Sequence, residues 1–457
     1  MHVQSNGVAI RVLVQHLRMS EERNISIRYP MQYSVFQAHT LYNAAKTREP
    51  DEEKWIVHAF AVQLEYWKGT ANMICSKQTE ITDALQVELQ TIRTEMHVGI
   101  QALINDLEQC KVETNIKFMQ NFGAAVEAMS SDCSRQLIGL VEKIMSYSVK
   151  MLNDPPPCPF AAVALGSLAR GEATPFSDLK YLFLIESKTA ETMKYFERLA
   201  VTSYFLIGSL GETKLSYMDI DELKGWFDDR STNGLKIDGL TTGAGNIPTG
   251  NGKTEGYQLI VTPDILMQHY KNVLASPDPT ESTCGDITAM LAFTQLIYSH
   301  RGGEVLLTQF TDTKKSVTLK SERLAADMEM LRSDIAKFHF EPSSGLVGRG
   351  FTINVKRELY RFPSILLYDL SIIFRKMETS SWESLKKLEQ EEILTSAAHN
   401  SLKFLLACAC FIRLAKYLHH GSHDDRVSVA SQMNSFHVFP GMGTVQQQRW
   451  FVPNKMF

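Results

Sequence analysis

Long hydrophobic runs and an excess of basic charge are both missing from this sequence. No stretch of about 18 consecutive apolar residues occurs, so we expect no membrane span and no membrane partner. The first residues lack the apolar core and the small-residue cleavage site of a secretory signal peptide, which predicts a cytoplasmic protein. The formal net charge is −4. Such a chain has no general basic footprint for nucleic acid, and we expect no nucleic-acid partner.

Cysteine is also sparse and lacks metal-binding spacing. The seven cysteines are scattered and odd in number. Cys408 and Cys410 do not have the C-x-x-C spacing of a zinc site. We therefore predict buried or free thiols in a reducing compartment.

The most informative stretch is residues 161–186, AAVALGSLARGEATPFSDLKYLFLIE. Residues 161–165 form a short apolar run that predicts a buried strand. Gly166 then permits close approach of a ligand to the backbone, and Ser167 is expected to cap a short helix whose free N–H groups attract anions. After a turn, residues 178–185 predict a second strand, in which Asp178 and Lys180 share one face because strands have period two.

This pattern, GSLARGEATPFSDL, resembles the signature of the DNA polymerase β-type nucleotidyltransferase superfamily. It is similar to the minimal nucleotidyltransferases of bacterial toxin–antitoxin pairs and to the PII-uridylyltransferase and glutamine-synthetase-adenylyltransferase group. The resemblance implies an α+β fold with a small mixed sheet. It also implies that Gly166 and Ser167 hold a nucleoside triphosphate and that Asp178 binds Mg²⁺. Lys180 stands where the family has a second carboxylate.

The third metal-binding carboxylate implied by the resemblance is Asp238. Residues 235–240 alternate like a short strand, and Lys236-Ile237-Asp238-Gly239 with its Gly-rich loop is similar to the corresponding segment of the uridylyl- and adenylyltransferase group. The alternative is a turn-forming aspartate before Gly239. Arg170 has two interpretations as well. It pairs with a phosphate through its two-pronged guanidinium, or it forms an ion pair with Glu172 or Asp178.

Five segments are predicted from composition and periodicity. Residues 1–70 are a helical segment, 71–153 a long helical hairpin, 158–275 the nucleotidyltransferase-like domain, 283–427 a C-terminal helical domain, and 431–457 an irregular tail. The hairpin follows from apolar residues at spacings of three and four, namely Ile81, Leu85, Leu89, Ile92, Met96, Ile100, Leu103 and Leu107. Its helices either form a dimerisation arm for a protein partner or pack within the chain.

The C-terminal segment is predicted to be helical from residues 287–298 onward. Its order resembles the C-terminal helical domain of bacterial nucleotidyltransferases that are often fused to cyclic-nucleotide-binding and CBS modules, with residues 355–358 and 411–414 in the matching places. The polar cluster after the last helix, His419, His420, His423, Asp424 and Asp425, has two interpretations. It is a solvated loop whose histidines stabilise the helix end, or it binds a metal.

Two functions follow from these residues. The first is a nucleotidyltransferase of the PII-uridylyltransferase-like type that passes UMP or AMP from a nucleoside triphosphate to a hydroxyl of a protein or small molecule. Asp178, Asp238 and Lys180 are its predicted catalytic residues, and Asp178 and Asp238 would bind Mg²⁺. The second is a catalytically impaired relative that acts as a nucleotide sensor or interaction scaffold. Lys180 separates the two, because a fixed positive charge repels a divalent ion.

Overall fold

The computed structural model describes most of the chain from residue 77 to residue 428. The described residues are 77–109, 116–152, 154–210, 212, 234–237, 260–274, 292–316, 328–329, 331–332, 335, 352–374, 376 and 378–428. The predictions for residues 1–70, for Asp238 and for the tail 431–457 lie outside them. Among the described helices, none has the length and apolarity needed to cross a membrane.

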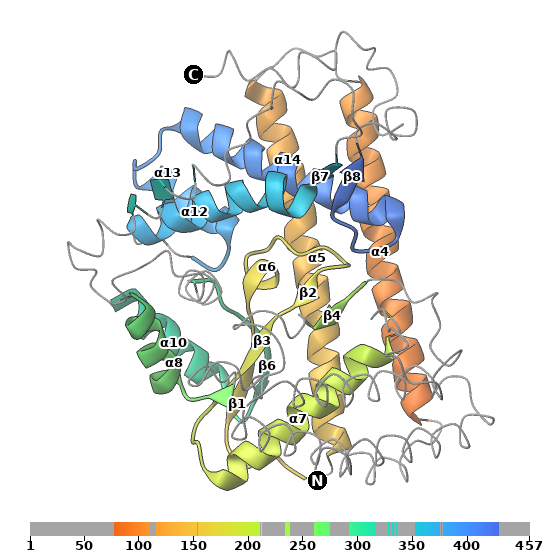
Figure 1. Ribbon diagram of the computed structural model, residues 1–457, viewed down its shortest axis with the longest axis vertical. Helices are drawn as coiled ribbons and strands as arrows, with labels where there is room; N and C mark the ends of the chain where they lie inside the picture. The colour runs from red at the N-terminus through yellow and green to blue at the C-terminus, as the bar shows by residue number, and fades with distance from the viewer. Residues whose placement is uncertain are drawn as a thin grey trace, which may run out of the picture.

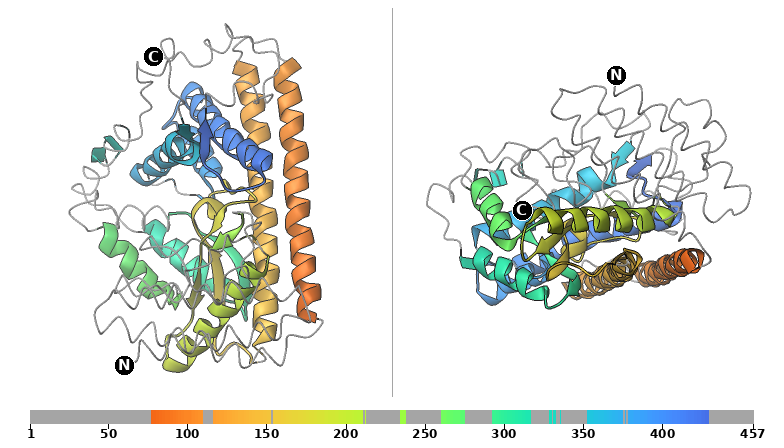
Figure 2. Two further views of the ribbon diagram at one scale, coloured as in Figure 1. Left: turned by 45° about the vertical axis from the view of Figure 1, so that its right-hand side comes forward. Right: turned by 90° about the horizontal axis from the view of Figure 1, so that it is seen from below.

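Two long helices run side by side along one flank of the described structure (Figure 1; Figure 2, left). They are α4 (Lys77–Gln109) and α5 (Ile116–Met151). The apolar stripe predicted for α4 is the face that packs on α5. Its most buried members are Leu85, Leu89, Ile92, Met96 and Ile100, and beyond them Ile104, rather than the predicted Leu103, is the buried residue. The two helices therefore pack on each other within one chain, and a dimerisation role for them stays a prediction.

A four-stranded mixed sheet forms the centre of the α+β fold. In spatial order it contains β5 (Ile260–Val261), β3 (Tyr181–Ile185), β1 (Phe160–Ala164) and β6 (Gln295–His300). β1 is antiparallel to both β3 and β6, and β3 is parallel to β5. β1 and β3 are buried throughout, which explains why both read as continuous apolar runs.

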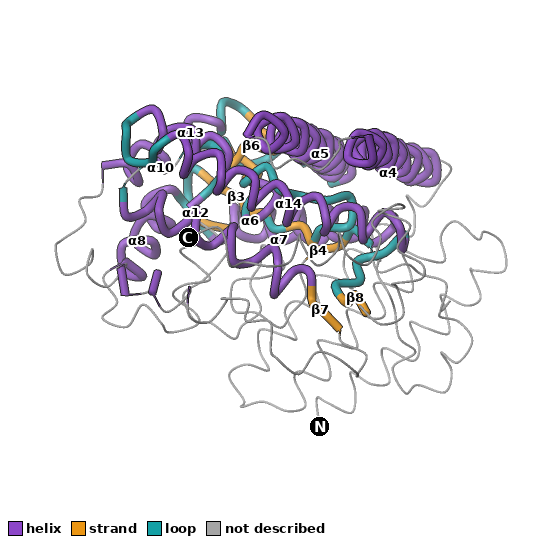
Figure 3. Tube along the Cα trace, turned by 90° about the horizontal axis from the view of Figure 1, so that it is seen from above, coloured by secondary structure: helices purple, strands orange, loops and turns teal. Residues whose placement is uncertain are grey.

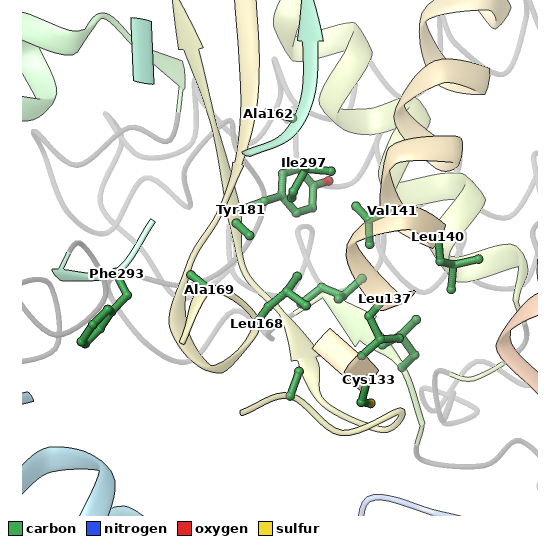
Figure 4. Packing of buried hydrophobic residues seen from close by; sticks show 14 of the residues in the cluster. Cys133, Leu137, Leu140, Val141, Ala162, Leu168, Ala169, Tyr181, Phe293 and Ile297 are labelled. Carbon is green, nitrogen blue, oxygen red and sulfur yellow. The ribbon is translucent and has the colours of Figure 1, made fainter. Parts of the chain in front are cut away.

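Alternate residues of the sheet belong to two separate apolar cores, as period two requires. On one face Phe160, Ala162 and Phe183 join the main core, which is covered by α5 and by α7 (Ala190–Ser209). The other face packs on α8 (Pro263–Leu274) and α10 (Glu304–Ser316). In Figure 4, Ala162, Tyr181 and Ile297 of the sheet and Val141 of α5 meet in the main core.

The structure corrects three sequence-based predictions around this sheet. Residues 295–300 form strand β6 rather than part of a helix, because their backbone pairs with β1 across the sheet. The predicted strand 178–185 is split at Lys180 into β2 (Asp178–Leu179) and β3. β2 leaves the main sheet and pairs in parallel with β4 (Lys236–Ile237). Ser167 does not cap α6 (Gly166–Ala169), whose capping position is Leu165.

A C-terminal helical unit packs against the same long helix that supports the sheet. It contains α12 (Arg361–Ile373), α13 (Ser381–Gln390) and α14 (Ser396–His420), and α14 contacts both α5 and α4. Seen from above, α4 and α5 lie along one edge, while the short strands β7 (Thr352–Asn354) and β8 (Arg426–Ser428) lie on the opposite side (Figure 3). Because α5 packs on α14, α7, β6 and α6, it sets the position of the sheet relative to the helical unit.

Candidate functional site

The Gly166 turn lies directly against the segment that carries Asp178. The backbone N–H of Leu165 donates to the carbonyl of Lys180 over 2.9 Å. Gly166 has φ of +64°, a left-handed conformation that glycine adopts without steric cost. A Cβ at Gly166 would lie 3.5 Å from Cδ of Lys180, so the lysine stem covers this turn. Gly166, Lys180 and Asp178 thus meet at one corner of the sheet.

Asp178 opens β2 and faces two basic side chains from the C-terminal unit. Nζ of Lys356 lies 3.4 Å from its Oδ2, and Nδ1 of His423 lies 3.6 Å from its Oδ1. The Asp178 side chain is 16% exposed, that of Lys356 is 40% exposed and that of His423 only 6%. We call these three residues the Asp178 cluster. It joins the motif to residues far away in the sequence.

Two neighbouring strands position Lys356. β7 (Thr352–Asn354) and β8 (Arg426–Ser428) pair antiparallel, and a short π-helix, η3 (Val355–Tyr360), follows β7. The side chain of Asn354 caps η3 by accepting from the N–H of Arg357 over 2.7 Å. The N–H of Val355 donates to the carbonyl of Asp425 over 2.8 Å. Lys356 therefore extends from an anchored turn.

His423 lies just beyond the end of α14. Gly421, with φ of 63°, ends that helix in the left-handed conformation, and the chain then turns toward Asp178. Nε2 of His423 lies 3.6 Å from Oδ1 of Asp425, which also accepts a short hydrogen bond from the Tyr417 hydroxyl. The interpretation of this segment as a solvated loop is wrong for His423, because its side chain is buried between two carboxylates.

The charges around His423 shift its titration. Burial alone lowers the pKa of this imidazole, but the nearby carboxylates of Asp178 and Asp425 outweigh burial and raise its pKa above the usual value. Burial raises the pKa of Asp425, yet His423 and Tyr417 outweigh it and the pKa falls below its usual range. Both shifts favour the charged forms, so the imidazolium–carboxylate pairs are stabilised.

A second ionic group, the Glu172 cluster, is centred on a completely buried carboxylate. It consists of Arg170, Glu172, Tyr360 and Ser364. Nε of Arg170 donates to Oε2 of Glu172 over 3.1 Å, the Ser364 hydroxyl donates to the same oxygen over 3.1 Å, and the Tyr360 hydroxyl makes a short hydrogen bond to it. Nη2 of Arg170 also donates to the Tyr360 hydroxyl over 3.2 Å. Arg170 thus forms the ion pair that was one of its two interpretations, and its phosphate role stays a prediction.

Arg413 of α14 connects the two clusters. Its side chain is buried, with Nη2 donating to the Ser177 hydroxyl over 3.2 Å and Nε donating to the Tyr417 hydroxyl over 3.3 Å. Its guanidinium carbon lies 4.4 Å from the centroid of the Tyr360 ring. Burial opposes its charge, but Tyr417 and Tyr360 outweigh burial and raise the pKa above the ordinary value. Arg413 therefore stays charged and holds the residue next to Asp178.

Further hydrogen bonds fasten the motif segment to α5 and α13. The N–H of Ala173 donates to the Ser134 hydroxyl of α5 over 3.0 Å. The indole N–H of Trp382 donates to the carbonyl of Gly171 over 3.1 Å, and the N–H of Ser381 donates to the carbonyl of Arg170 over 3.3 Å. The segment between the Gly166 turn and Asp178 is therefore fixed from several sides.

Of the residues predicted from sequence, Gly166, Ser167, Asp178 and Lys180 lie in one region, and Arg170 points into the neighbouring buried cluster. Lys356 and His423 are not among the residues predicted for this site. Lys356 belongs to a segment that had been matched to the C-terminal domain of the bacterial relatives. His423 was singled out only within the polar cluster after α14, and no local pattern links it to Asp178, which is far away in the sequence.

The described residues do not by themselves fit a magnesium site. Asp178, the predicted metal-binding carboxylate that lies within the described residues, has a basic side chain near each of its oxygens. These side chains compete with a metal for the same lone pairs. Among the described residues no group of three His, Cys, Asp or Glu could hold a metal ion. Asp238 lies outside them. The Mg²⁺ expected from the resemblance thus stays a prediction, and we derive no chemical step through it.

The Gly166 turn and the aspartate at the start of β2 lie in a segment that is similar to a known family. Residues 111–211 match the sequence profile of a family described as "Putative nucleotidyltransferase DUF294". The matched segment contains α5, β1, α6, β2, β3 and α7, and with them Gly166, Asp178 and Lys180. The match supports a nucleotidyltransferase-type family, for which a nucleotide is the substrate. No curated protein matches the chain.

Proposed function

We propose that this protein is a nucleotidyltransferase of the protein-PII uridylyltransferase-like type. It would transfer a nucleoside monophosphate from a nucleoside triphosphate to a hydroxyl acceptor. The family match supports the class, and the GSLARGEATPFSDL motif supports the finer type. In this reaction the acceptor oxygen bonds to the α-phosphorus while the bond to pyrophosphate breaks, and the hydroxyl proton passes to a base or to water. The protein's tasks are to position the triphosphate and to stabilise the charge that develops.

One observation carries the proposal. The Gly166 turn and the Asp178 segment are joined by the backbone hydrogen bond from Leu165 to Lys180, and β4, which directly precedes Asp238 in the sequence, pairs with β2. The turn that we propose to bind phosphate and the first carboxylate of the motif thus lie at one corner of the sheet. Lys356 of the C-terminal unit reaches that corner, which supports a site that closes around the triphosphate from two sides.

The test is a transfer assay with UTP and ATP that carry a radioactive α-phosphate. The reaction is measured, with and without Mg²⁺, by the release of unlabelled pyrophosphate and by the appearance of labelled acceptor or nucleoside monophosphate. Asp178→Asn is the matched control, because it keeps the shape of the side chain and removes the charge. We expect activity in the natural protein and a loss of at least about a hundredfold in the variant. Equal rates in both would refute the assignment of Asp178.

A second candidate is favoured by the positive charges at the motif. Lys180 stands at the family's second carboxylate, and Lys356 and His423 face Asp178. This arrangement suits a catalytically impaired relative that binds a nucleotide as a sensor or scaffold. The Lys180→Asp variant separates the candidates: gain of magnesium-dependent transfer from an inactive parent supports impairment, whereas a parent that is already active excludes it.

A further inference from the structure

We propose that Lys356 serves as the cation of Asp178 in place of a metal ion, so that the protein binds a nucleoside triphosphate in its metal-free form. This inference rests on the proposed function, because it concerns the same nucleotide and the same corner of the sheet. It adds a residue of the C-terminal unit to the binding site and specifies the form of the ligand.

The position of the Lys356 ammonium group supports this assignment. Nζ of Lys356 lies 3.4 Å from Oδ2 of Asp178, on the side chain that the motif would offer to a cation. The imidazole of His423 lies near the other oxygen, at 3.6 Å. Both oxygens of the carboxylate therefore already face nitrogen atoms that come from the C-terminal unit.

Lys356 is also held there by its surroundings. β7, which precedes Lys356 in the sequence, pairs with β8, and the Asn354 cap fixes the first turn of η3. The hydrogen bond from Val355 to Asp425 ties the same turn to the loop that carries His423. A cation fixed in this way needs little reorganisation when an anionic ligand binds.

Lys356 is also accessible to a ligand. The Lys356 side chain is 40% exposed, whereas Asp178 is 16% exposed and His423 is 6% exposed. An ammonium group has three donors, so Lys356 can contact Asp178 and still donate to a phosphate oxygen from its open side. Lys180, whose stem lies against Gly166, adds a second positive charge next to the turn. These lysines favour a polyanion, and they disfavour an additional divalent cation at the same place.

The experiment is a calorimetric titration with ATP and with UTP, each in EDTA and in Mg²⁺, using the full chain. Lys356→Gln is compared with Arg357→Gln, which removes the same charge from the next, exposed position. We expect the natural protein to bind at least one nucleotide in EDTA, with an affinity within about threefold of that in Mg²⁺. Lys356→Gln should weaken the metal-free binding by about tenfold or more, and Arg357→Gln by less than about threefold. Lys356→Arg keeps the charge and should retain most of the binding, which guards against a misfolded glutamine variant.

Three results would overturn the inference, and they separate it from the proposed function. Binding only in Mg²⁺ would show that a metal is needed. Tighter magnesium-dependent binding by Lys356→Gln would show that the lysine competes with a metal. Equal weakening by the Arg357 and Lys356 variants would show a general charge effect. In all three the nucleotide still binds, so the proposed function stands. If neither nucleotide binds under either condition, the proposed function fails together with this inference.

Discussion

Glu172 and Asp178 belong to the same short segment, and both meet polar side chains from the C-terminal part of the chain, but their surroundings differ. The Glu172 side chain is completely buried, and Arg170, Tyr360 and Ser364 all bond to one of its oxygens. Asp178 is partly exposed, and its basic neighbours lie at 3.4 and 3.6 Å. The Glu172 carboxylate is enclosed in a hydrogen-bonded network, whereas the Asp178 carboxylate is partly exposed and pairs with its basic neighbours over longer distances.

This difference assigns separate tasks to the two acidic residues of the motif. A buried charge that loses its partner is costly, because the remaining charge has neither water nor a counter-ion. Partly exposed pairs contribute little to folding, because water screens them. Glu172 therefore joins the sheet domain to the helical unit, whereas Asp178 pairs with Lys356, whose 40% exposed side chain a ligand can reach. Substitutions that separate stability from binding can test this comparison.

The largest effect is expected from Glu172→Gln. The variant leaves the Arg170 guanidinium, which is only 15% exposed, without its carboxylate, and we expect the free energy of unfolding to fall by about 3–5 kcal/mol. Urea unfolding measures it, with the exposed Glu186→Gln as the matched control, for which a change within about 0.5 kcal/mol is expected. A similar small loss in both variants would show that Glu172 is not a structural centre.

Lys314 provides a contrast, since burial and the nearby Lys315 lower its pKa to about 7. Below pH 7 the folded and unfolded states are both protonated there, and folding carries the full cost of the buried charge. Above pH 7 the folded state releases the proton first, so stability should rise with pH until about 10.5, the ordinary value. The slope is at most about 1.4 kcal/mol per pH unit.

Urea unfolding at pH 7 and pH 9 tests this sign. Lys314→Met should lack this contribution to the rise, and the exposed Lys315→Met should retain most of it. If the natural protein and Lys314→Met respond to pH in the same way, Lys314 does not titrate in this range. The expected behaviour is opposite to that of Arg170 and Arg413, whose pKa values are raised because hydroxyl and carboxyl neighbours outweigh burial.

A smaller loss is expected from Arg413→Lys. Lysine keeps the charge, but it cannot reach Ser177 and Tyr417 while lying flat over the Tyr360 ring. We expect a loss of about 1–3 kcal/mol in thermal or urea unfolding. Arg198→Lys, in an exposed pair with Asp154, is the control and should change little. Equal losses in the two variants would mean that the planar guanidinium of Arg413 is not required for stability.

The smallest effect on stability is expected from Asp178→Asn. The pair with Lys356 is partly exposed, and the buried His423 keeps its second carboxylate, Asp425, so the free energy of unfolding should change by no more than about 1 kcal/mol. Chemical unfolding beside Glu172→Gln provides the comparison within a single segment. If the two variants lose the same stability, Asp178 is as structural as Glu172, and the separation of tasks between them is wrong.

The parts of the fold that follow local periodicity could be predicted from the sequence. The α4 stripe, including Leu85 and Leu89, has the helical spacing that its burial on α5 requires. The buried strands β1 and β3 appear as short apolar runs because both sheet faces are covered. Strand β6 was mistaken for the start of a helix, although Gln295–His300 contains β-branched and aromatic residues, since its partner β1 lies far away in the chain.

The candidate site could be predicted only from the motif side. Gly166 and Asp178 lie in a short segment whose pattern is specific, so their proximity could be inferred. Lys356 and His423 enter the site through the packing of α14 on α5, which no local pattern encodes. The pairing of β2 with β4 also explains why the prediction of a single strand over residues 178–185 fails at Lys180. A single strand would keep period two, but β2 leaves the sheet.

Because Gly421 ends α14 in the left-handed conformation, the length of α14 determines where His423 lies. Each helical residue advances the chain by about 1.5 Å and rotates it by about 100°. One residue inserted or deleted before Gly421 would therefore turn the imidazole to another side of the helix axis, away from Asp178, unless α14 itself shifted on α5. Point substitutions on the exposed face of α14 leave this spacing unchanged. Changes in the length of α14 should thus be far rarer among related proteins than changes in its surface residues.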